Sequence, residues 1–204
     1  MSRTGLKRTC GLCVIVLVLN ACTSVSTREP FSDKHLAYRD RAEKLQRISG
    51  WTLTGKISLD DGDHGGSGHL RWEVQQENSQ IDFHAALGRG AWHLQINPGS
   101  ATLKEANGVE QTAPRVDGLI QARMGWSIPV EALQSWLLGL AAPGVGSAIE
   151  LDPEGLLISL QQLGWTVNFS RYETVTGVKL PKRLNAKRDN YRVKLVIRNW
   201  YLEN

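Results

Sequence analysis

The feature that most constrains this chain is the alternation of apolar and polar side chains over residues 51–59. Trp51, Leu53, Ile57 and Leu59 are apolar, and the even-numbered residues between them are threonine, lysine or serine. Because successive residues of a strand face opposite sides of a sheet, this pattern is typical of a strand with one covered face and one face in water. Antiparallel sheets commonly have such faces, so the segment predicts an antiparallel sheet.

The same alternation returns at intervals of about ten residues, and turn sequences such as Asn97-Pro98-Gly99 separate the segments. Strands at this spacing are typical of an antiparallel meander, and we expect about nine to eleven of them. The further segments with this pattern are residues 70–74, 81–87, 92–96, 101–105, 156–160, 165–169, 178–180 and 191–197.

Three segments have helical spacing. One follows Ser32, which suits an N-cap, and reaches about residue 48, and a second covers residues 115–124. The clearest covers residues 130–140 and is followed by Pro143-Gly144, a pair that ends helices. The predicted fold class is mainly β (α+β): a partly closed antiparallel β-barrel with the two later helices as a lid over an apolar interior.

The N-terminus has the parts of an export signal. Arg3, Lys7 and Arg8 make a positive start, and Leu12–Leu19 is an unbroken apolar run. The run is too short to span a bilayer, which needs roughly 20 apolar residues. The following Leu19-Asn-Ala-Cys22 resembles the bacterial lipobox, in which the cysteine is acylated and the chain is cut before it.

We therefore expect lipid on Cys22, where two or more acyl chains would anchor the protein stably. By resemblance to enterobacterial lipoproteins, the absence of aspartate at Thr23 favours the outer membrane, so the expected location is its periplasmic face. The predicted parts are a removed signal peptide (1–21), a lipidated tether (22–31) and a single domain (32–204).

Charge excludes one class of partner. The chain has 24 basic and 20 acidic residues, and the signal holds three of the basic ones. The remaining balance of about +1 gives no reason to expect nucleic acid as a partner. One local basic run, between Lys179 and Arg188, is either a solvated surface or a contact for anionic lipid or an acidic partner.

The interior of the predicted sheet is either filled by side chains or hollow, and periodicity does not distinguish the two. In a hollow interior, inward residues would line an apolar cavity for lipid chains. The candidate cavity residues share the inward phase of a strand or the apolar stripe of the 130–140 helix. They are Trp51, Leu53, Ile57, Leu70, Trp72, Phe83, Leu94, Leu133, Trp136, Leu137, Leu140 and Trp165.

Enzyme and metal motifs do not emerge from the sequence. There is no G-x-S-x-G elbow, and the aspartates at 60, 61 and 63 lack the spacing of a calcium loop. His69, His84 and His93 lie on the polar phase of strands, where we expect solvated side chains. We therefore predict no catalytic residues, no metal and no cofactor.

The assembled residues resemble the outer-membrane lipoprotein receptor LolB family over nearly the whole mature chain. The most specific match is Ile128-Pro-Val-x-x-Leu-x-x-Trp-Leu-x-Gly-Leu140. One departure is Phe169, where relatives commonly have an aromatic hydroxyl. The other matching motifs are the lipobox, Trp51-x-Leu-x-Gly-Lys-Ile57, Gly68-x-Leu-x-Trp72, Leu87-Gly88, Gln162-x-Gly-Trp-x-Val-x-Phe169, Leu180-Pro181 and Val193-x-Leu-x-Ile-x-x-Trp200.

The resemblance implies a receptor that takes acylated lipoproteins from a soluble periplasmic carrier and inserts them into the outer membrane. It implies acyl chains, outer-membrane lipid and the carrier as partners, and we expect a monomer. It also implies that an exposed leucine on a loop before a strand, here Leu87, is important for the final release into the membrane, although its phase equally fits a buried strand end.

The expected movement is a displacement of the 130–140 helix that exposes Trp136, Leu137 and Leu140 to incoming chains. Two alternatives stay open. One is an envelope scaffold or assembly lipoprotein with a packed core and no lipid cavity, and the other is a hydrolase with an unusual site.

Overall fold

The computed structural model describes residues 33–203, with the exception of residues 87–89 and 126. Its strands are β1 (Gly50–Asp60), β2 (Gly65–Gln75), β3 (Asn78–Ala85), β4 (Ala91–Asn97), β5 (Ser100–Glu105), β6 (Glu110–Ala113), β7 (Ser147–Leu151), β8 (Leu157–Gln162), β9 (Trp165–Val175), β10 (Val178–Arg188) and β11 (Tyr191–Glu203). They form one open sheet in the order β6-β5-β4-β3-β2-β1-β11-β10-β9-β8-β7. Every neighbouring pair is antiparallel, and the first strand joins the last in the middle.

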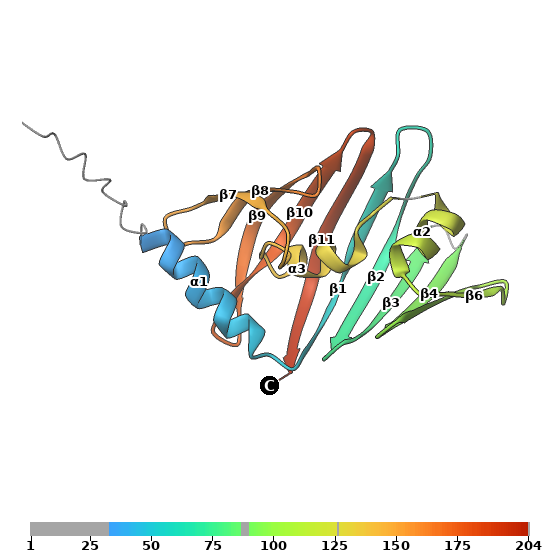
Figure 1. Ribbon diagram of the computed structural model, residues 1–204, viewed down its shortest axis with the longest axis horizontal. Helices are drawn as coiled ribbons and strands as arrows, with labels where there is room; N and C mark the ends of the chain where they lie inside the picture. The colour runs from blue at the N-terminus through green and yellow to red at the C-terminus, as the bar shows by residue number, and fades with distance from the viewer. Residues whose placement is uncertain (1–32, 87–89, 126, 204) are drawn as a thin grey trace, which may run out of the picture. The chain divides into compact units, whose positions relative to one another are not determined.

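Three helices pack on one face of this sheet (Figure 1). Helix α1 (Asp33–Gln46) lies beside β7 and β10, and α2 (Val116–Met124) lies beside β5 and β6. Helix α3 (Val130–Leu137) crosses in front of the middle strands, and its buried residues belong to the same apolar core as the inward residues of β1 and β11. This core lies wholly within the compact unit Phe31–Asn204.

The alternation that predicted β1 agrees with its burial except at Thr52, which is also buried. All four apolar residues of the 51–59 segment are buried, whereas Lys56 is exposed. The ring of Trp51 lies between Trp72 and Trp200, with centroid distances of 6.1 and 5.4 Å. Aromatic pairs at this spacing add about 0.5–1.5 kcal/mol each to the burial of their area. The cluster therefore joins β1 to both of its neighbours.

Glycine is required where β2 meets β3. A Cβ atom built on Gly68 would lie 2.3 Å from the carbonyl oxygen of His84 and 2.6 Å from the ring of Phe83. Both distances are shorter than van der Waals contact, so any side chain would push the two strands apart. Gly68 thus sets how closely β3 and its inward phenylalanine approach β2.

The predicted fold class is confirmed, with the strand number at the top of the expected range. Two strands were missed, β6 and β7, because they are edge strands whose residues are mostly exposed and show little alternation. The last helix ends at Leu137 rather than at residue 140, because Gly139 takes a left-handed conformation with φ of 71°. The covering helices make the predicted lid.

Candidate functional site

The covered face of the sheet encloses a gap lined only by apolar side chains. It measures about 50 Å³ and lies between strands β1–β4 and the segment that runs from α2 into α3. Ligand pockets measure about 300–1,000 Å³, so an acyl chain fits here only if the helices move away. The lining residues are Ile57, Leu59, Leu70, Trp72, Ile81, Trp92, Leu94, Ile120, Ile128, Val130 and Leu133.

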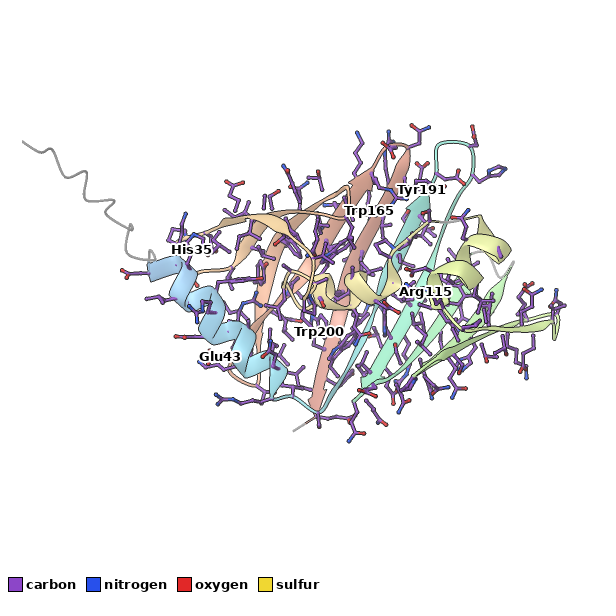
Figure 2. The ribbon with its side chains drawn as sticks, viewed as in Figure 1. His35, Glu43, Arg115, Trp165, Tyr191 and Trp200 are labelled. Atoms are coloured by element: carbon purple, nitrogen blue, oxygen red, sulfur yellow. The ribbon has the colours of Figure 1, made fainter. Side chains whose placement is uncertain are left out.

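The residues predicted to line a cavity are all buried, but the structure divides them between two places. Those that line the gap are Ile57, Leu70, Trp72, Leu94 and Leu133. Those that pack elsewhere in the apolar core are Trp51, Leu53, Phe83, Trp136, Leu137, Leu140 and Trp165. Figure 2 labels Trp165 and Trp200, two members of this core.

Several residues that line the gap were not predicted from the sequence. Leu59, Ile81 and Trp92 share the inward phase of their strands, and that signal was sufficient to find them. Ile120 and Val130 belong to helices. The apolar stripe of a helix predicts which side of the helix is covered, but not which strand lies beneath that side. The position of these two residues over the gap is set by how the helices lie on the sheet.

The rim of the gap is formed by its half-buried members. Trp92 and Ile128 are half-buried, whereas the other lining residues are buried. Trp92 stacks on Phe83 with a centroid distance of 5.2 Å, which holds the indole against the sheet. Solvent therefore reaches the gap between β4 and the connection that precedes α3.

A buried amide holds the C-terminal end of α3. The Nε1 atom of Trp136 donates to Oε1 of Gln162 over 2.9 Å, and the backbone N–H of Ala142 donates to the same oxygen over 2.8 Å. The Nε2 atom of Gln162 donates to the carbonyls of Ala142 and Val145. Gln162 is only 3 % exposed, so these bonds are shielded from water.

Arg41 of α1 also holds the C-terminal end of α3. Its guanidinium donates to the carbonyls of Leu138 and Gly139 just past α3, and to that of Lys179 on β10. A cation at a helix C-terminus also complements the helix dipole. Burial lowers the pKa of Arg41 from its ordinary value, and nearby Tyr172 opposes this shift.

Among the described residues, fewer hydrogen bonds hold the N-terminal end of α3. The backbone N–H of Val130 donates to Oδ1 of Asp117 over 3.1 Å. Arg188 donates to the carbonyl and hydroxyl oxygens of Ser127 in the connection before the helix. The same guanidinium lies over the rings of Trp165 and Tyr191, which Figure 2 labels.

The two ends of α3 therefore differ. Its C-terminal end and the segment just after it are held by hydrogen bonds of Arg41 and Gln162, two of which are buried and the others part-buried. Its N-terminal end, next to the gap, is held by part-buried bonds from Asp117 and Arg188. Breaking part-buried bonds costs less because water replaces the lost partner. Among the described residues, the gap therefore lies next to the end of α3 that has only part-buried hydrogen bonds.

The three histidines of strands β2, β3 and β4 lie on the outer face of the sheet, opposite the gap. His69 and His84 are exposed on the outer face of the sheet, as their phase predicted, and half-buried His93 bonds Asp82 there over 2.7 Å. Among the described residues, no three histidine, cysteine, aspartate or glutamate side chains come together as a metal site. In this same part of the chain no helix has the length and apolar character that crossing a bilayer requires. Cys22 and Leu87 lie outside the described residues.

Solved structures with the same arrangement include lipoprotein-sorting proteins. A putative outer membrane lipoprotein-sorting protein domain from Vibrio parahaemolyticus matches with a TM-score of 0.53 at 8% identity, over 83% of this chain and 92% of its own. A LolA superfamily protein from Nitrosomonas europaea matches with a TM-score of 0.50 at 11% identity, over 83% and 94%. At these identities the likeness concerns the fold alone.

Proteins related in sequence match this chain at higher identity than these solved structures do. The family model described as "Outer membrane lipoprotein LolB" matches residues 49–200. An outer-membrane lipoprotein LolB from Alkalilimnicola ehrlichii is 35% identical, over 91% of this chain and 92% of its own. Those from Pseudomonas savastanoi and Nitrosococcus oceani are 33% and 31% identical, over 91% and 95% of this chain and 92% and 98% of their own. These names describe a lipoprotein and not an enzyme, which agrees with the prediction that this protein is not an enzyme. This chain therefore belongs to the outer-membrane lipoprotein LolB family.

Proposed function

We propose that this protein accepts the acyl chains of lipoproteins from a periplasmic carrier beneath α2 and α3, and inserts them into the outer membrane. In this proposal lipid on Cys22 holds the domain at the periplasmic face of that membrane, and the protein acts as a monomer. The observation that carries the proposal is the gap lined only by apolar side chains under a helical lid. Membership of the LolB family supports the setting.

The free energy of lipid transfer requires direct contact between carrier and acceptor. Each buried methylene contributes about 0.8 kcal/mol, so an anchor of several chains is worth tens of kcal/mol against water. Release of such an anchor into the periplasm would be too slow to serve transport. The chains must therefore pass from one apolar interior to the next and then into the bilayer.

The helices of the lid must move away from the sheet for an acyl chain to enter. The free energy gained by burying the chain must offset the cost of exposing the lid's own apolar residues. Exposing a buried leucine, isoleucine or valine costs about 1.5–3 kcal/mol, which an entering chain of a dozen methylenes offsets. Because the gap adjoins Ile120, Val130 and Leu133, these residues meet the chains first. Trp136 and Leu137, nearer the held end, follow as the lid opens further.

A transfer assay tests the proposal. Residues 22–204 with Cys22→Ala are mixed with a lipoprotein-loaded carrier, and the position of the cargo is measured after separation. Cargo should move to this protein, and Leu133→Asp should prevent the movement because it places a charge in the gap. Ile158→Asp, at an exposed position of β8, is the matched control. Cargo that stays on the carrier with the unsubstituted domain would refute the proposal.

A second variant remains informative if Leu133→Asp fails to fold. Asp117→Ala removes the hydrogen bond at the N-terminal end of α3 and should raise the rate of acceptance about fivefold, because the lid opens more often. Glu131→Ala, an exposed change in the first turn of α3, should leave the rate unchanged. Equal rates for all three proteins would exclude an opening at this end.

A second candidate function is an envelope scaffold lipoprotein with a packed core. The observation that favours it is the size of the gap, about 50 Å³, since the other inward side chains fill the interior. A fluorescent fatty-acid analogue distinguishes the two functions. An acceptor binds it in competition with unlabelled fatty acid, whereas a scaffold with a closed core does not.

A further inference from the structure

The outer face of the sheet carries exposed cations across its middle strands. We call this set the basic face. Among the described residues none of its members takes part in an ion pair. Its members are Lys56 on β1, Arg183 and Lys187 on β10, and Arg192, Lys194 and Arg198 on β11.

The strand register brings these cations together. Lys187 is directly opposite Arg192, and Val196 lies between Lys56 on one side and Arg183 on the other. Neighbouring strands are about 4.8 Å apart, and like charges directly opposite each other are destabilising. These cations are exposed and do not contribute to the apolar core, so their mutual repulsion is not offset by packing within the protein. This indicates that a negatively charged surface outside the protein compensates their charge.

The acidic side chains nearby are already engaged. On the same face Glu73 pairs with Arg71, and the carboxylate of Asp82 lies 2.7 Å from His93. Glu173 of β9 pairs with Lys182 over 3.0 Å. Asp60, opposite Arg192, and Glu203, near the end of β11, are further acids of this face among the described residues. The face therefore keeps a net positive charge.

Two further features of this face suit a lipid surface. A recess of about 360 Å³ lies beside Arg198, where β11 bulges against β1, and the charged and imidazole side chains of His69, Arg71, Asp82 and His84 share its lining. Val196 and Tyr201 are 45% and 57% exposed on β11. Cations next to exposed aliphatic and tyrosine side chains are typical of surfaces that lie at the headgroup level of a bilayer.

We propose that the basic face lies against the phosphate headgroups of anionic lipids, with a headgroup in the recess beside Arg198. The proposal rests on the proposed function for its setting, since the tether of residues 22–31 would reach at most roughly 35 Å from a lipidated Cys22. The domain would then stand with its outer face on the bilayer and its helices turned away from it. A broad face of separate flexible cations suits a fluid lipid surface better than one shaped protein partner.

Vesicle binding tests this assignment without the lipid anchor. Residues 22–204 with Cys22→Ala, which keep the whole compact unit, are floated with phosphatidylcholine vesicles that contain or lack phosphatidylglycerol. Binding should require phosphatidylglycerol and weaken with salt. The triple variant Arg183→Gln/Lys194→Gln/Arg198→Gln should bind roughly one hundred-fold more weakly. The control Lys44→Gln/Arg47→Gln/Arg115→Gln removes the same charge elsewhere and should bind as the parent does.

Each other outcome overturns the proposal. Equal weakening in both triple variants would show only an effect of net charge. Unchanged vesicle binding together with slower cargo transfer from the carrier would make the face a protein-docking surface instead. Vesicle binding is measured without cargo, so it tests the basic face even if the protein does not accept lipoproteins from the carrier.

Discussion

The indole Nε1 of Trp136 donates a hydrogen bond to Oε1 of Gln162 over 2.9 Å in the interior of the molecule. Trp136 is 1% exposed and Gln162 is 3% exposed, so water cannot replace either partner. The bond ties the lid helix α3 to strand β8. The same amide also binds the backbone of Ala142 and Val145. One side chain thus fixes the end of the lid and the segment after it.

Replacing this amide should therefore destabilise the protein. Gln162→Ala leaves the buried Trp136 indole and the part-buried Ala142 N–H without their partner, and we expect the free energy of unfolding to fall by about 3 kcal/mol. For a domain of this size the melting temperature would fall by roughly 6–12 °C. Thermal and urea unfolding measure both quantities. Gln161→Ala, at the exposed neighbouring position, should change them little, and equal effects would contradict the assigned role.

The close approach of β2 and β3 gives a second prediction. Gly68→Ala places a methyl group against the carbonyl of His84 and the ring of Phe83, and we expect a loss of about 3 kcal/mol in unfolding free energy. Gly66→Ala, on the same strand with nothing within 4 Å of its built Cβ, is the control and should be neutral. Two alanines of equal effect would show that backbone entropy, not the steric contact, explains the result.

Alkaline conditions should weaken the contact between β9 and β8 at Tyr172. Burial raises the pKa of Tyr172 above its ordinary value of 10.0, and its hydroxyl donates to the carbonyl of Leu157 over 2.8 Å. A raised pKa means that the folded state holds the proton more tightly. The stability from this group is therefore complete below pH 10 and is lost as the pH rises above it.

Comparison with Tyr172→Phe isolates this effect. The variant should be about 1 kcal/mol less stable near pH 8, because the hydrogen bond is lost, and its stability should fall less steeply than that of the parent above pH 10. Urea midpoints across this range measure both slopes. Tyr201→Phe, at an exposed position, controls for the removal of a hydroxyl group. Parallel slopes for parent and Tyr172→Phe would refute the role of Tyr172.

The family resemblance gives a prediction for the loop after β3. Leu87→Glu should leave acceptance of cargo from the carrier intact and slow its insertion into membranes, because a carboxylate resists entry into lipid. Acceptance is measured in solution, and insertion by the cargo found in vesicles. Ala86→Glu, one residue earlier, is the control for charge. A similar loss of both steps in Leu87→Glu would argue against a separate role in insertion.

The candidate site could be predicted only in part. Phase predicted that Ile57, Leu70 and Trp72 face inward, and they line the gap. The same phase applies to Leu53, which packs in the filled part of the core. Phase describes the side of the sheet on which a residue lies. Whether space remains above it depends on where a helix rests and which side chains meet there.

The sequence alone determined that this chain forms an antiparallel sheet with one covered face, because side-chain alternation is a local property of each strand. It also located α2 and α3 and the motifs of the LolB family. Only the tertiary structure decided that β1 pairs with β11, and that Arg41 and Gln162 hold one end of the lid. It also decided that Arg183, Lys194 and Arg198 share one face with Lys56. These relationships join residues far apart in the chain, so their geometry depends on the register and packing of the whole sheet.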